Sequence, residues 1–122
     1  MSNVIYYASS ISSTSTNIIN TVSASKEVII LSYRIGNNTG QKITVSLKVK
    51  DNSDTFLFYL LPPTIIEPDD YLQWEGKDFL INPQKLVFET DVIGDITVML
   101  SGDESDLDIG KNWYITSVPT EN

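Results

Sequence analysis

Hydrophobic and polar positions alternate most regularly between residues 42 and 50. One set of alternate positions is apolar, and the positions between them are lysine, threonine or serine. The apolar set is Ile43, Val45, Leu47 and Val49. A period of two predicts a β-strand with one buried face and one solvated face. Residues 27–35 are rich in β-branched and aromatic side chains, and residues 37–40 between the two runs favour a turn. The two runs are therefore expected to form a hairpin.

Further strands are predicted along most of the chain. Turn residues at 51–54 precede residues 55–61, where both alternating sets are apolar, which fits a central strand or a strand covered by a partner. Pro62 and Pro63 are expected to end this strand, because proline cannot donate a ladder hydrogen bond. Shorter strands are expected at residues 64–66, 71–74, 78–81, 86–89 and 96–101. Short strands between frequent turns are typical of a sandwich or barrel, and no segment has a convincing helical period.

These patterns predict an all-β fold, a single antiparallel β-sandwich of the Ig-like or jelly-roll-like kind, over residues 18–102. Residues 1–17 are predicted to be an extended N-terminal arm, because Ile11 is the only apolar residue in a serine and threonine tract. The pattern leaves open whether this arm is disordered or docks on a neighbour. Residues 103–122 are predicted to be a C-terminal tail, with one short strand at 112–117.

Composition narrows the possible chemistry. The 122 residues suit one domain, and they include no cysteine and no histidine. Disulfides, thiolate metal sites and histidine-dependent catalysis are therefore excluded. Acidic residues outnumber basic ones by 16 to 8, so a surface of net charge −8 repels phosphate backbones. Neither a nucleic acid nor a membrane is expected as a partner, and no apolar run is long enough to span a bilayer.

Three groups of side chains could carry chemistry. The acidic run at residues 103–108 offers oxygen ligands for calcium, but its spacing departs from the EF-hand pattern, so a solvated acidic loop is predicted. The pair Asp69 and Asp70 follows Pro68 and is predicted to be a turn. The third group, Tyr71, Trp74 and Phe79, could form a sugar-stacking platform, although core or interface packing is favoured. The chain is accordingly not expected to be an enzyme, and no cofactor or metal is predicted.

Two apolar clusters lie in otherwise polar terminal segments and are the candidate partner-binding residues. They are Val4, Ile5, Tyr6 and Tyr7 near the start, and Trp113, Tyr114 and Ile115 near the end. Apolar anchors on extended segments commonly dock into a neighbour's pocket. The aromatic cluster of the tail could equally fold back on its own domain.

Several segments occur in an order that also appears in a known family. They are residues 20–30, which lead into the first core strand, a strand and turn at 33–38, a hairpin at 43–51 and 56–60, a long segment at 65–86 that contains Trp74-Glu75-Gly76-Lys77, and a final strand at 94–104. In this order, residues 18–104 resemble the small β-sandwich virion proteins of tailed bacteriophages, of the capsid decoration or cement type.

The resemblance implies a structural virion protein, made in the host cytoplasm, that binds and stabilises the head shell. Its partners would be the major capsid protein or other virion proteins, and it would form a homo-oligomer. The alternative is a neck, tail or fibre-associated carbohydrate-binding module that uses Tyr71, Trp74 or Trp113 as a stacking surface.

Overall fold

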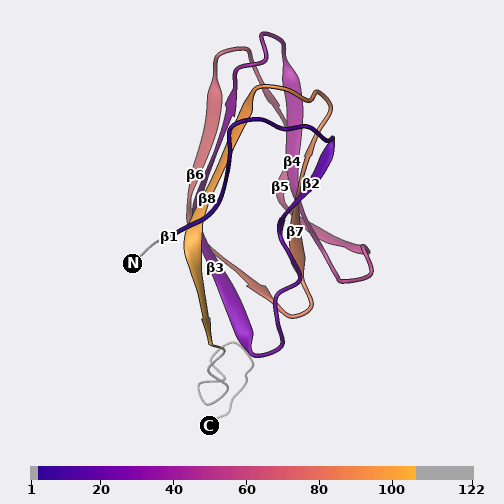
Figure 1. Cartoon of the computed structure of the whole chain (residues 1–122), viewed down its shortest axis with the longest axis vertical. Helices are drawn as coiled ribbons and strands as arrows, with labels where there is room; N and C mark the ends of the chain where they lie inside the picture. The colour runs from indigo at the N-terminus through magenta and orange to yellow at the C-terminus, as the bar shows by residue number, and fades with distance from the viewer. Residues whose placement is uncertain (1–2, 107–122) are drawn as a thin grey trace.

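The computed structural model describes residues 3–106, which form eight β-strands and no helix (Figure 1). The strands are β1 (Asn3–Ala8), β2 (Ser15–Ile19), β3 (Lys26–Asn37), β4 (Ile43–Lys50), β5 (Phe56–Ile66), β6 (Tyr71–Ile81), β7 (Lys85–Thr90) and β8 (Ile96–Asp106). They build two four-stranded sheets, in the orders β1-β8-β3-β6 and β2-β7-β4-β5, and every pairing is antiparallel. The predicted all-β sandwich is confirmed.

The strand pairing identifies the type of sandwich. The pairs β4–β5, β3–β6, β2–β7 and β1–β8 are nested one inside the next along the chain. Eight antiparallel strands wound in this way form a jelly roll, whereas an Ig-like sandwich divides its strands differently between the sheets. Of the two forms that the sequence left open, the jelly roll is the one found.

The inner faces of the two sheets supply the core. Alternate side chains of β4 are fully buried, as the period of two predicts, and they meet Phe88 of β7 and Leu100 of β8 in one apolar cluster. Burial of each such side chain contributes about 1.5–3 kcal/mol to folding. The long strands β3 and β8 pair with each other at the centre of their sheet and carry much of this cluster.

The predicted hairpin between residues 27–35 and 42–50 is wrong, because β3 and β4 lie in different sheets. Asn37 shows why the chain crosses over. Its side chain is fully buried, and its amide nitrogen donates to the carbonyls of Gln41, Ile66 and Glu67 at 2.7–3.1 Å. Its amide oxygen accepts from the backbone N–H and the hydroxyl of Thr39. Asn37 thus links the β3–β4 connection to the β5–β6 connection at one end of the sandwich.

Strands β5 and β6 also differ from the prediction. Strand β5 is an edge strand, not a central one, and it continues through Pro62 and Pro63. An edge strand can include proline, because the outward side of its backbone needs no donor for a ladder. Strand β6 is continuous where two strands and a turn at Glu75-Gly76 were expected. Gly76 lies so close to the Trp74 ring that a Cβ would approach it to 2.5 Å, so the missing side chain serves packing here and not a turn.

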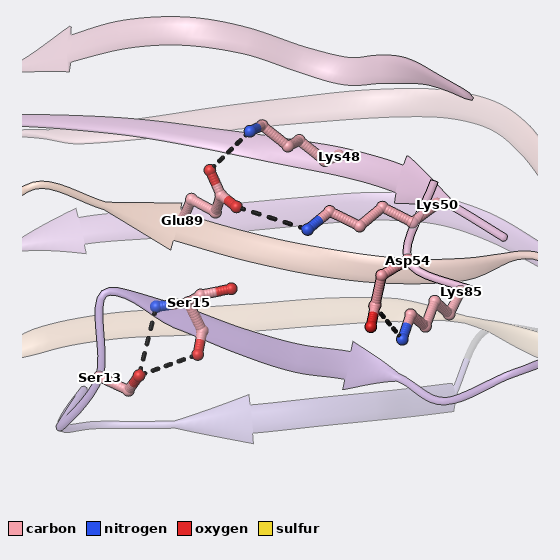
Figure 2. Close-up of polar contacts among 7 residues, drawn as sticks. All are labelled: Ser13, Ser15, Lys48, Lys50, Asp54, Lys85 and Glu89. Atoms are coloured by element: carbon pink, nitrogen blue, oxygen red, sulfur yellow. Dashed lines mark hydrogen bonds and ion pairs between the residues drawn. The ribbon is translucent and has the colours of Figure 1, made fainter. Parts of the chain in front are cut away.

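Residues 3–19 are not a separate arm, because β1 pairs with β8 and β2 pairs with β7. Between them, Ile11 is buried and exchanges two backbone hydrogen bonds of 2.9 Å with Gly94. The hydroxyl of Ser13 donates to the carbonyl of Ser15 and accepts from its N–H, which shapes the entry to β2 (Figure 2). A polar tract can join a sheet in this way, because its backbone provides the ladder and a single isoleucine provides the apolar contact.

The C-terminal boundary differs as well. Strand β8 runs to Asp106, past the expected domain end at residue 102. Gly102 is required within it, because a Cβ there would lie 2.0 Å from the carbonyl oxygen of Ile29. The candidate anchors Trp113, Tyr114 and Ile115 lie outside the described residues.

Replacing Asn37 with alanine should lower the free energy of unfolding by roughly 2–4 kcal/mol, because three buried or half-buried carbonyls lose their donor. Urea denaturation measures the change. The matched control is Asn38→Ala at the exposed neighbouring residue, which should leave stability nearly unchanged. Equal losses in both variants would contradict the role assigned to Asn37.

Deleting residues 1–16 should destabilise the sandwich by more than about 2 kcal/mol, because the deletion removes β1, half-exposes β8 and takes away the buried Ile11. Thermal unfolding followed by circular dichroism provides the measurement. The substitution Tyr7→Ser, at an exposed position of β1, is the control and should have little effect. A truncated chain as stable as the full one would show that the N-terminal strands are dispensable.

Candidate assembly interface

Exposed apolar side chains gather on one side of the sandwich. Of the ten large hydrophobic side chains that are exposed in the described part of the chain, eight belong to β5 and β6. They are Phe56, Leu57, Phe58, Tyr59 and Ile65 on β5, and Tyr71, Phe79 and Ile81 on β6. We call this set of residues the edge face. Exposed apolar side chains in such number commonly mark an interaction surface, and here they belong to the edge strands of two different sheets.

The sheet orders explain why these residues lie together. At one end of the sandwich, each short connection joins a strand of one sheet to the strand that has the same place in the order of the other sheet. Residues 67–70 join β5 to β6 in this way. Both strands are the last of their sheet, so two free strand edges lie on the same side of the molecule. The connection is held by Asn37, whose backbone N–H and carbonyl bond to Asp70 and Asp69.

Strand β5 contains Pro62 and Pro63 near its end, but it has no protection by charge. Natural edge strands are commonly guarded by charged side chains, yet no residue from Phe56 to Ile66 is charged. Residues 56–59 are 40–46% exposed on both faces of the strand. The turn that joins β4 to β5 lies at the right of Figure 1, away from the rest of the two sheets. This end of β5 is therefore open to a partner from both faces.

Three lysines on β4 and β7, near the β4–β5 turn, form ion pairs (Figure 2). On the outer side of the sheet, Lys48 and Lys50 of β4 both reach the carboxylate of Glu89 on β7, at 2.8 and 3.8 Å. The hydrogen bond to Glu89 raises the pKa of Lys48. The Lys48 ammonium also lies 6.0 Å from the ring centroid of Phe56 and 5.9 Å from that of Tyr59. A third ion pair joins Lys85 of β7 to Asp54 in the β4–β5 turn and orients this hairpin.

On β6, Trp74 is engaged in packing, whereas Tyr71 and Phe79 are exposed. Trp74 stacks on the buried Tyr33 with ring centroids 5.2 Å apart and an interplanar angle of 16°. Burial raises the pKa of the Tyr33 phenol, and the charge of Asp78 adds to the shift. The Arg34 guanidinium lies 3.8 Å from the ring centroid of Tyr71. With Gly76 against its ring as well, Trp74 has the packing role that the sequence favoured over sugar stacking.

The candidate residues of the N-terminal segment differ in exposure. Ile5 and Tyr6 are half-buried and pack against the core, whereas Tyr7 is 61% exposed. Val4 pairs with Ser101 in the β1–β8 ladder. Apart from Tyr71 and Phe79, which were weighed for sugar stacking or packing, the edge face was not among the candidates. Its signal was visible in residues 55–61, where both alternating sets are apolar.

The acidic run does not form a calcium loop within the described residues. Its first part belongs to β8, and Asp106 forms an ion pair of 2.7 Å with Lys26, which lowers the pKa of the Asp106 carboxyl. No group of three or more metal-ligating side chains occurs in residues 3–106. Asp69 and Asp70 form the turn that was predicted. A groove of about 360 Å³ on the β1–β2 side has a mixed apolar and polar lining, with Glu104 as its ionisable group.

No family model matches the chain, and no curated protein matches it. Among solved structures, the core of Drosophila NLP is similar over 84% of this chain and 99% of its own, with 12% identity and a TM-score of 0.48. The T13 particle of IBDV is similar over 83% of this chain and 30% of its own, with 8% identity and a TM-score of 0.43. A Podospora anserina GH26-CBM35 β-(1,4)-mannanase is 11% identical over 86% of this chain and 27% of its own, with a TM-score of 0.40. At these values the likenesses carry no argument about function.

No helix in residues 3–106 could cross a membrane.

Acid should weaken the β4–β5 hairpin through Asp54. Lys85 lowers the pKa of this carboxyl from its ordinary value of 3.8, so the folded state binds the proton less readily than the unfolded chain does. The resulting stabilisation is fully present above pH 3.8 and is lost as the pH falls through the lowered pKa. Replacing Asp54 with asparagine should flatten this acid limb in urea titrations at stepped pH. The same substitution at the exposed Asp95 is the control and should leave the limb in place.

Proposed function

We propose that this protein is a structural component of a tailed-bacteriophage virion, and specifically a capsid decoration or cement protein that binds and stabilises the head shell. The observation that carries the proposal is the edge face, an uncharged apolar strand edge on an otherwise well-packed sandwich. Such a surface suits lasting attachment to other protein subunits, because its burial removes both apolar side chains and unpaired backbone groups from water.

Two further features support a virion role. Jelly rolls recur in viral capsid domains, although they also occur in lectins, so this support is an analogy at the level of fold. The order of segments in residues 18–104 resembles that of decoration proteins. On a symmetric shell, many modest contacts combine into strong attachment, which a small module with one adhesive side would exploit.

The proposal includes the absence of catalysis. The chain has no cysteine or histidine. Among the carboxylates of the described residues, Asp54, Glu89 and Asp106 are held in ion pairs with lysines. The major capsid protein or another virion protein is the proposed partner, and the virion is the proposed location.

A carbohydrate-binding module is the rival that the packing disfavours. The stacking surface expected at Trp74 is occupied by Tyr33, and Arg34 lies over Tyr71. Selective binding on a glycan array, lost in the Trp74→Ala variant, would support the rival against the structural role.

Mass spectrometry of purified particles, followed by electron cryomicroscopy, tests the proposal. The protein should be present in fixed copy number, and density of its size should lie on the head shell. Particles assembled without it should lose their DNA at lower temperature than complete particles. Its absence from particles would overturn the virion role, and density on the neck or tail would overturn the decoration role.

A further inference from the structure

We infer that the outer face of the β1-β8-β3-β6 sheet binds a protein partner through Arg34, which receives one carboxylate side chain that the partner presents among apolar residues. This surface shares only Tyr71 with the edge face, and the inference is independent of the virion role because it concerns the purified protein. It starts from an exposed guanidinium that is held in place by neutral groups and that forms no ion pair within residues 3–106.

Four side chains form one row across all four strands of this sheet. They are Tyr7 of β1, Met99 of β8, Arg34 of β3 and Gln73 of β6, each in register with the next. Arg34 lies between the buried Tyr33 and Ile35, so the alternation along β3 directs its side chain to the outer face. Tyr7 is 61% exposed, and Arg34 is the charged residue of the row. Tyrosine and arginine are among the residue types most enriched at the centres of interfaces, so the row has the composition of a protein-binding surface.

Neutral groups hold the Arg34 side chain in place. Its Nη1 donates to the Oε1 atom of Gln73 at 2.9 Å, and its guanidinium carbon lies 3.8 Å from the ring centroid of Tyr71. Neither contact removes the positive charge, and the bond to Gln73 uses only one of the five N–H donors of a guanidinium. A side chain that is already held in one position loses less conformational entropy when a ligand binds. The arginine is therefore prepared to receive an anionic group.

The lysines of the described residues provide a contrast. Those that contact a carboxylate are Lys26, Lys48, Lys50 and Lys85. Each of these cations is already paired within the chain, whereas the charge of Arg34 is left for a partner.

Arg34 borders two hollows on this face. One, of about 250 Å³, is also lined by Asp69 and Asp70, whose negative charges disfavour an anion there. The other, of about 140 Å³, has no carboxylate in its lining, which consists of Ser32, Tyr33, Arg34, Gln73 and Met99. Glu75 pairs with Ser32 in the ladder but does not line this second hollow. Small-molecule sites commonly have about 300–1,000 Å³, so the second hollow has room for a single side chain of a larger partner.

A carboxylate is the group that fits the donors of the second hollow. The planar guanidinium matches both oxygens of a carboxylate and can donate two parallel hydrogen bonds to them. The Ser32 hydroxyl and the Gln73 amide can add further donors, and Met99 and Tyr7 provide apolar contact. One arginine on a chain of net charge −8 is too little to bind a phosphate backbone, and a strongly acidic partner would be repelled as a whole. The partner therefore carries a single carboxylate within an apolar surface.

Nuclear magnetic resonance of the natural chain tests the contact directly. Arg34 is the only arginine, so labelling with nitrogen-15 arginine gives a single Nε–H signal. The probe is a short peptide with one glutamate between two phenylalanines and with blocked ends, and its counterpart has glutamine in place of the glutamate. The glutamate peptide should shift the Arg34 signal to saturation and bind at least about five-fold more tightly than the glutamine peptide.

Inorganic phosphate in the same titration should bind more weakly than the glutamate peptide, because it makes no apolar contact. An unshifted Arg34 signal, equal affinity of the two peptides, or tighter binding of phosphate would overturn the inference.

Substitutions test whether the guanidinium itself is needed. Arg34→Gln should lower the affinity for the glutamate peptide at least about five-fold, measured through the signals of the peptide. The matched control Lys42→Gln removes the same charge at another exposed residue and should bind like the natural chain. Arg34→Lys keeps the charge but cannot form two parallel hydrogen bonds, so it should also lose affinity. Thermal unfolding establishes that each variant is folded. Equal losses in Arg34→Gln and Lys42→Gln, or full binding by Arg34→Lys, would contradict the assigned contact.

Discussion

The buried amide of Asn37 holds together the end of the sandwich on which the edge face depends. One side chain satisfies the carbonyls of Gln41, Ile66 and Glu67, which belong to two different crossings between the sheets. A fully buried asparagine is tolerated because both its donor and acceptor groups are paired. The same contacts keep the end of β5 beside the start of β6, so that the two free edges lie on the same side of the sandwich. The candidate interface is in this sense a product of a buried polar cluster.

Local patterns in the sequence predicted much of the fold. The alternation at residues 43–49 identified the core face of β4, and the turn at 51–54 led correctly into β5. Pairing between strands was harder to predict. Strand β1 is far in sequence from its partner β8, and β2 is far from its partner β7, so no local pattern indicates which strands pair. The hairpin expected between β3 and β4 failed for this reason. The N-terminal segment was wrongly predicted to be a separate arm, because it joins the sheets through backbone hydrogen bonds, which amino-acid composition does not reveal.

The candidate interface, too, could be predicted from the sequence only in part. Two apolar faces in residues 55–61 indicated either a central strand or one covered by a partner, and only the sheet order distinguishes these cases. The prediction about Trp74 succeeded because large aromatic residues commonly pack, and here Tyr33 and Gly76 provide the space and the contact. The contribution of Ile81 to the edge face could not be predicted, since the sequence does not show which strand ends its sheet.

The nested pairing of the strands also affects the order in which the strand pairs can form while the chain is being synthesised. Strands β4 and β5 are joined by a short turn, whereas β1 must pair with a strand that ends at Asp106. Closing a longer loop costs more chain entropy, so the innermost pair is the least costly and the outermost the most costly to form. During translation, the apolar β5 emerges from the ribosome well before β8 can complete the opposite sheet. A nascent chain therefore displays its most adhesive strand while its framework is still incomplete.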